Sequence, residues 1–182
     1  MEGIIIKNES NNYTVRTTKG INICKPRGKF RLDKIIPLVG DKVIIDDNNN
    51  YILDVKERKN SLIRPQIANV DIAIIVTSVK EPNFDSNLLD KLLTIISYNN
   101  IEPVICLTKL DLLNSKEKKE INNIINYYKS VGYIVTDNSN IKEIKEIING
   151  KVIVFAGQSG AGKSSLLNKF LLLSPQLTIS CG

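Results

Sequence analysis

The sequence predicts a small β-barrel followed by a mostly parallel α/β domain. In residues 3–56, short β-rich runs are separated by turn residues, which is typical of a barrel. From residue 66 onward, apolar runs suited to strands alternate with apolar residues at helical spacing. The 182 residues have room for one ordinary domain or two small ones. We therefore expect a barrel over residues 1–65 and a second domain over residues 66–182.

The first region contains five candidate strands, separated by turns such as the one at Gly20. They are Ile4–Lys7, Tyr13–Thr18, Ile21–Lys25, Lys42–Ile45 and Tyr51–Val55. Five strands in so short a stretch favour the oligonucleotide-binding fold, or OB-fold, which is common among barrels of this size. An SH3-like barrel is the alternative.

The second region contains four strand-helix repeats. The predicted strands are Val70–Thr77, Ile101–Leu107, Tyr133–Thr136 and Lys151–Ala156. Helices follow them: Asn114 with Glu117 three residues later forms a capping box, and another helix begins at about Lys163. Four such repeats predict a mostly parallel sheet, and ligands of such sheets bind at the carboxyl ends of the strands.

Composition excludes several kinds of site. The chain contains no His, which excludes Ser-His-Asp and Cys-His nucleophile systems and any metal site with a His ligand. Its three cysteines, Cys24, Cys106 and Cys181, lack CxxC spacing, as expected for a protein of the reducing cytoplasm. No apolar run approaches the ~20 residues of a membrane span, so we expect no membrane partner.

A phosphate-binding loop follows the last predicted strand, where residues 157–164 match the pattern GxxxxGK[ST]. We expect nucleotide contacts from this loop and the next residue: Gly157, Gln158, Ser159, Gly160, Ala161, Gly162, Lys163, Ser164 and Ser165. Glycines let successive N–H groups turn toward phosphate oxygens, and the helix behind adds its positive end. In this role Lys163 reaches the β- and γ-phosphates and Ser164 gives its hydroxyl to Mg²⁺.

A second motif, Thr108-Lys109-Leu110-Asp111, ends the second strand of the α/β region and is similar to the [NT]KxD element with which GTPases read guanine. Asp111 would accept hydrogen bonds from the guanine N1–H and exocyclic amine. Adenine lacks both donors, so a buried carboxylate in this role rejects adenine. Ser139, after the third strand, has the position of a guanine-contacting serine, but we interpret its loop as a turn.

The order of the two motifs indicates a circular permutation. In ordinary small GTPases the phosphate loop comes first, whereas here it follows the base-reading tetrad. Several stretches then resemble the RsgA (YjeQ) family of circularly permuted GTPases that assist assembly of the small ribosomal subunit. Besides the two motifs, these stretches are Gly28–Arg31, Val39–Asp41, Leu62–Pro65, Ile67–Asp71 and Phe155–Asn168.

The resemblance implies an RNA-binding OB-fold followed by a permuted P-loop GTPase domain, with GTP, Mg²⁺, 16S rRNA and the 30S subunit as partners. We expect a monomer. Charge agrees with RNA contact, since residues 1–65 hold 13 basic and 8 acidic side chains. Our candidates for RNA contact are the basic residues Lys25, Arg27, Lys29 and Arg31. The aromatic residue Phe30 lies between the last two of them. The alternative is a solvated basic loop.

The chain departs from the family after Asn168, and no DxxG motif occurs anywhere in it. We interpret the GTPase domain as incomplete at its C-terminus, with no catalytic residue in this chain, and we expect at most weak nucleotide binding and negligible turnover from the 182 residues alone. The family's Zn²⁺ site would lie in a further C-terminal domain. Two alternatives stay open: an ATP-using P-loop enzyme such as a kinase, and a non-catalytic rRNA-binding barrel with an inactive GTPase remnant.

Overall fold

The computed structural model describes residues 1–28, 30, 35–171 and 179–181. The chain divides into two compact units, Met1–Val70 and Asp71–Gly182. Among the helices of the described residues, none is both long and apolar enough to cross a membrane.

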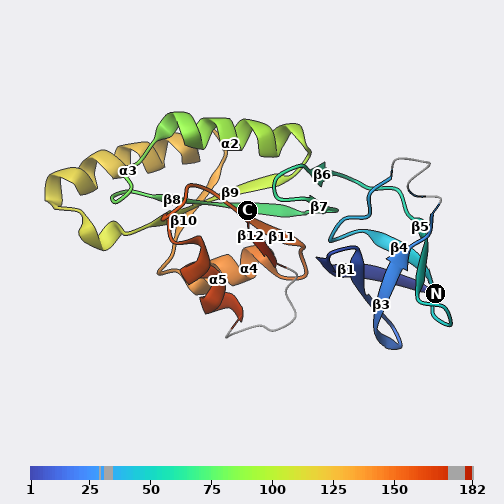
Figure 1. The fold of residues 1–182 in the computed structure, drawn as a ribbon. Helices are drawn as coiled ribbons and strands as arrows, with labels where there is room; N and C mark the ends of the chain where they lie inside the picture. The colour runs from blue at the N-terminus through green and yellow to red at the C-terminus, as the bar shows by residue number, and fades with distance from the viewer. Residues whose placement is uncertain (29, 31–34, 172–178, 182) are drawn as a thin grey trace. The chain divides into compact units, whose positions relative to one another are not determined.

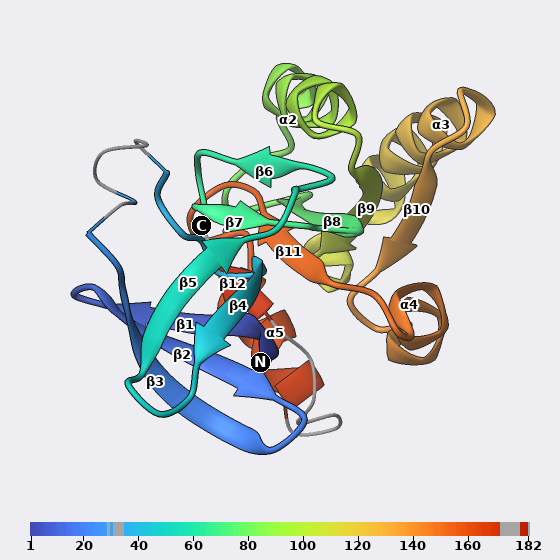
Figure 2. The same ribbon diagram turned by 90° about the vertical axis from the view of Figure 1, so that its right-hand side faces the viewer.

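The first unit is built on a closed five-stranded barrel. Its strands are β1 (Glu2–Glu9), β2 (Asn12–Thr17), β3 (Gly20–Pro26), β4 (Lys42–Asp46) and β5 (Tyr51–Val55). They pair in the order β1-β2-β3-β5-β4, and β4 closes the barrel onto β1 (Figure 2). The parallel pairing of β3 with β5 agrees with an OB-fold, which confirms the predicted barrel.

Local sequence explains the barrel. Ser10 and Asn11 both have positive φ, 50° and 68°, as the tight turn between β1 and β2 requires. Side chains then alternate between the core and the outside, so that Tyr13 and Val15 of β2 are buried beside Ile5 of β1.

A short hairpin that sequence periodicity did not predict follows the barrel. Its strands are β6 (Ser61–Leu62) and β7 (Ile67–Ala68). It belongs to the first unit, because the Ala68 N–H donates to the Val39 carbonyl at 2.8 Å. The Asn60 side chain also bonds both the N–H and the carbonyl of Val70. These bonds explain why the next strand begins at Ile72 rather than at Val70.

The second unit is a five-stranded parallel sheet of order β10-β9-β8-β11-β12. Its strands are β8 (Ile72–Ser78), β9 (Glu102–Thr108), β10 (Ile134–Asp137), β11 (Ile153–Ala156) and β12 (Ile179–Cys181). Its helices are α2 (Ser86–Tyr98), the short 3₁₀ helix η1 (Leu110–Leu112), α3 (Ser115–Ser130), α4 (Ile141–Ile148) and α5 (Lys163–Leu171). The predicted α/β class is confirmed.

Helices cover both faces of this sheet. Figure 1 shows α2 and α3 on one face and α4 and α5 on the other. On the α4 and α5 side, Ile144, Leu166 and Phe170 pack against strand residues such as Ile74. Burial on both faces explains why β8 is a nearly continuous apolar run. The predicted capping box of α3 is present, since Asn114 and Glu117 bond each other's backbone N–H groups.

Candidate functional site

The glycine-rich loop connects β11 to α5, and the position of its first residue explains why it is glycine. Gly157 has φ +135°, and a Cβ on it would lie 2.1 Å from the Val76 carbonyl oxygen of the neighbouring strand β8. No other residue fits without moving a backbone that is held in the middle of the sheet. The loop therefore begins in close contact with β8.

The loop presents donors that suit an anion. Among the described residues, the N–H groups of Gly160, Gly162 and Lys163 have no hydrogen-bond acceptor. The Lys163 amine donates to the carbonyls of Gly157 and Gln158 at 2.8 and 3.1 Å. A cation and several free N–H groups at the start of a helix are the arrangement that binds phosphate. Ser164 and Ser165 are exposed on the first turn of α5, where a hydroxyl is available to a metal ion.

The tetrad contacts this loop directly. Thr108 is the last residue of β9, and its hydroxyl donates to the carbonyl of Ala161 at 2.6 Å in a buried contact. A Cβ on Gly162 would lie 3.7 Å from the same threonine side chain. The fold thus joins residues 108–111 and 157–164 into one site, although one strand, β8, lies between β9 and β11.

Beyond Thr108 the chain turns sharply. Lys109 has left-handed backbone geometry, φ +61°, and its amine donates to the carbonyl of Glu81. Leu110 and Asp111 then lie in η1, where Asp111 is exposed. This turn carries Asp111 past the end of the sheet, so its carboxylate is exposed in the chain alone, and burial of that carboxylate against a base stays a prediction. Its oxygens are open to an incoming donor.

Ser139 does not point to a ligand. Its N–H donates to the Asp137 carboxylate at 2.8 Å, and its hydroxyl donates to the same oxygen. Such side-chain to backbone bonds close a local turn. The loop is nevertheless held at the same edge of the sheet, because the Asn138 N–H donates to the carbonyl of Leu107.

Sequence reasoning missed the segment between β8 and α2, residues 79–85. Its Glu81 carbonyl accepts from Lys109, and Pro82 lies 3.7 Å from where a Gly160 Cβ would be. The segment therefore touches both motifs. No local sequence signal marks this segment, because the strand order that puts the end of β8 between the two loops is seen only in the folded structure.

Buried sulfur takes no part in this site. Burial and the nearby Asp137 carboxylate raise the pKa of the Cys106 thiol to about 12. No cluster of three or more His, Cys, Asp or Glu side chains able to hold a metal lies in the described part of the chain.

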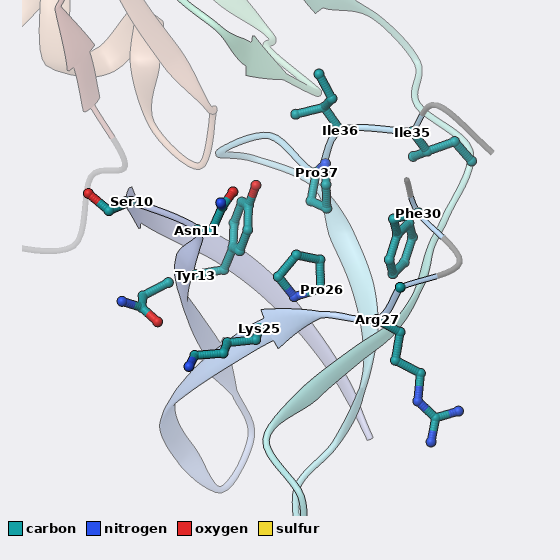
Figure 3. Close-up of a pocket in the computed structure, with 12 residues that line it drawn as sticks. Ser10, Asn11, Tyr13, Lys25, Pro26, Arg27, Phe30, Ile35, Ile36 and Pro37 are labelled. Atoms are coloured by element: carbon teal, nitrogen blue, oxygen red, sulfur yellow. The ribbon is translucent and has the colours of Figure 1, made fainter. Parts of the chain in front are cut away.

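The candidate RNA contacts belong to the first unit. Lys25 and Arg27 are exposed at the end of β3 and line a groove of about 750 Å³. Figure 3 shows the two side chains leaving the strand in different directions, with the ring of Pro26 between their starting points and the ring of Phe30 above Arg27. Lys29 and Arg31 lie outside the described residues. The apolar side of the groove, formed by Ile35, Ile36 and Pro37, was not predicted.

Comparison with known proteins agrees with this geometry. Residues 55–180 match the RsgA GTPase family, and residues 2–52 match the RsgA N-terminal domain. The chain belongs to the RsgA GTPase family. The small ribosomal subunit biogenesis GTPase RsgA of Bacillus cereus is 45% identical over 186 residues, which cover 98% of this chain and 62% of that protein. The RsgA of Caldanaerobacter subterraneus is 42% identical over 92% of this chain and 59% of its own length.

Two solved RsgA-type structures share the fold. The crystal structure of YjeQ from Thermotoga maritima matches with a TM-score of 0.82 and 36% identity, over 98% of this chain and 66% of that one. YloQ, described as a circularly permuted GTPase, matches with a TM-score of 0.79 and 40% identity, over 97% of this chain and 65% of that one. This confirms the permuted order. The chain spans about three fifths of the length of the curated relatives.

Proposed function

We propose that this chain binds guanine nucleotides as part of a GTPase that assists assembly of the small ribosomal subunit. The observation that supports the proposal is the buried 2.6 Å bond from the Thr108 hydroxyl to the Ala161 carbonyl, because it joins residues 108–111 to the loop of residues 157–164. Membership of the RsgA family and the printed names of the relatives support the ribosomal role.

In this proposal each motif has its own task. The N–H groups around Gly160 and Gly162 and the Lys163 amine bind the phosphates, and Asp111 accepts from guanine. The Ser164 hydroxyl would hold Mg²⁺, which neutralises charge on the phosphates when it is bound. The Ser164 hydroxyl fits this ion, because its oxygen is the kind of hard ligand that Mg²⁺ takes and the residue is exposed on the first turn of α5. Zinc has no role in the proposal for these residues.

The barrel supplies the RNA-binding part. Lys25 and Arg27 at the groove neutralise phosphates of 16S rRNA within the 30S subunit, and the protein acts as a monomer in the cytoplasm. We expect little turnover from the 182 residues alone. No DxxG occurs in them, and hydrolysis needs a positioned water and charge stabilisation in addition to binding.

Nucleotide competition tests the proposal. A fluorescent GDP analogue bound to the chain should be displaced by GDP and GTP and not by ADP. Displacement by ADP as effectively as by GDP would instead favour an ATP-using enzyme. Asp111→Asn should shift preference from guanine to xanthine nucleotides, whereas Glu120→Gln, an exposed change on α3, should not. If no nucleotide binds while the chain binds rRNA, the non-catalytic barrel alternative is correct.

A further inference from the structure

Lys80 lies just after β8, and its amine bridges two parts of the second unit. The amine donates to the Glu117 carboxylate at 2.9 and 3.1 Å and to the Leu112 carbonyl at 3.4 Å. Glu117 is in the first turn of α3, and Leu112 ends η1, the turn that carries Asp111. One cation therefore connects the end of a central strand to the base-reading segment and to the next helix.

Glu117 is fixed independently of Lys80. Its carboxylate accepts from the Asn114 N–H at 2.8 Å, and the Asn114 side chain accepts from the N–H of Glu117 in return. The bond from Asn114, together with that from Lys80, lowers the pKa of the Glu117 carboxyl. The charged acceptor for Lys80 is thus held in place by the start of a helix.

Asp111 has no comparable support of its own. Among the described residues, its carboxylate has no hydrogen-bond or ion-pair partner. Its direction depends on a backbone turn closed by two bonds, from the Leu112 N–H to the Lys109 carbonyl and from the Leu113 N–H to the Leu110 carbonyl, at 3.1 and 3.3 Å. Lys80 holds the carbonyl of the residue that follows Asp111.

We propose that Lys80, anchored by Glu117, is a positioning residue that orients Asp111 and thereby sets selectivity for the guanine base. The proposal rests on the proposed guanine binding. Loss of the amine frees the turn while the Thr108 contact with the phosphate loop remains. Affinity for the guanine N–H groups that donate to Asp111 should therefore fall, whereas affinity for the phosphates should not change.

The test compares Lys80→Met with Lys119→Met in the complete 182-residue chain. Methionine keeps the unbranched four-atom stem of lysine and removes the amine, and Lys119 is exposed on α3. Dissociation constants are measured for GDP, IDP and ADP; IDP lacks the exocyclic amine from which Asp111 would accept a hydrogen bond. We expect Lys80→Met to reduce the preference for GDP over IDP by about two- to fivefold, which is within the range for a partly exposed ion pair. Lys119→Met should leave it unchanged.

Two further measurements separate positioning from general stability. Amide hydrogen exchange of Leu112 and Leu113, without nucleotide, should quicken by a similar factor in Lys80→Met and not in Lys119→Met. Lys80→Arg keeps a cationic donor and should retain the preference for GDP over IDP. If Lys80→Met proves unstable, loss of selectivity in a stable Glu117→Gln variant gives the same support.

The outcomes are distinct. A preference for GDP that survives in Lys80→Met, with exchange equal to that of Lys119→Met, would overturn this inference alone. Equal binding of GDP and ADP by the unmodified chain would overturn the proposed function, and this inference with it.

Discussion

The hydroxyl of Thr108 donates to the carbonyl of Ala161 at 2.6 Å, across 53 residues of sequence. Thr108 ends β9, and Ala161 lies in the loop before α5. Both residues are buried. In the proposed function this bond joins the segment that binds the base to the loop that binds the phosphates, so the spacing between the two, which must match the length of a nucleotide, would depend on it.

Thr108→Val should therefore weaken nucleotide binding. Valine has the same shape as threonine, but it leaves the buried Ala161 carbonyl without a donor, which costs roughly 1–3 kcal/mol. We expect about a tenfold rise in the dissociation constant for GDP, measured by titration of a fluorescent analogue. Thr77→Val is the control, since no hydrogen bond of the Thr77 side chain is found among the described residues. Equal affinities for the two variants would refute the role of this bond.

Gly157→Ala should damage the fold as well as the site. The new Cβ would lie 2.1 Å from the Val76 carbonyl oxygen, so the loop or β8 must move. We expect a lower melting temperature and loss of GDP binding. Gly132→Ala separates this clash from backbone strain, because Gly132 also has positive φ, +97°, but no atom within 4 Å of its Cβ position. An equal fall in melting temperature for both variants would show that the close contact with Val76 is not what requires glycine at position 157.

Local signals were enough to predict the five barrel strands, strands β8 to β11 and the capping box of Asn114 and Glu117, but not the short hairpin of β6 and β7. Long-range side-chain pairs were not predictable. Lys80 pairs with Glu117 across 37 residues, and Arg58 pairs with Asp41 across 17. With 25 basic and 19 acidic side chains in the chain, no periodicity selects these partners, because only the folded topology brings them together. The exposure of Asp111 depends on a single 3₁₀ turn, which has no clear sequence signature.

Arg58→Met should destabilise the barrel. Arg58 donates to both carboxylate oxygens of Asp41 at 2.7 Å, and Asp41 is completely buried. Without Arg58, the buried Asp41 carboxylate keeps only the Leu38 N–H as a donor among the described residues. Such an unpaired buried charge should lower the free energy of unfolding by roughly 3 kcal/mol. Hydrogen exchange of peptides from residues 1–70 in increasing urea measures this. The exposed Lys42→Met is the control, and equal midpoints for the two variants would contradict the prediction.

Cys106 should not react in the folded chain. Burial raises its pKa to about 12, so at pH 8 the nucleophilic thiolate is scarce as well as covered. Maleimide labelling followed by peptide mass mapping should show slow modification of Cys106 in buffer and rapid modification in concentrated urea. Because the folded pKa is raised, labelling should increase with pH. Fast labelling of Cys106 at pH 8 without urea would show that this core opens.

Neutralising Lys25 and Arg27 should change how RNA binding depends on salt. Each cation that contacts a phosphate releases counterions, so removing one reduces the slope of log affinity against log salt by about 1. We expect the double variant Lys25→Gln, Arg27→Gln to bind 16S rRNA more weakly at low salt. Its slope of log affinity against log salt should be smaller by about 2. The control is Lys7→Gln, whose lysine pairs with Glu9 at 2.8 Å on β1. If the double variant and the control keep the same slope, these two residues do not contact RNA phosphates, and the basic end of β3 is only a solvated surface.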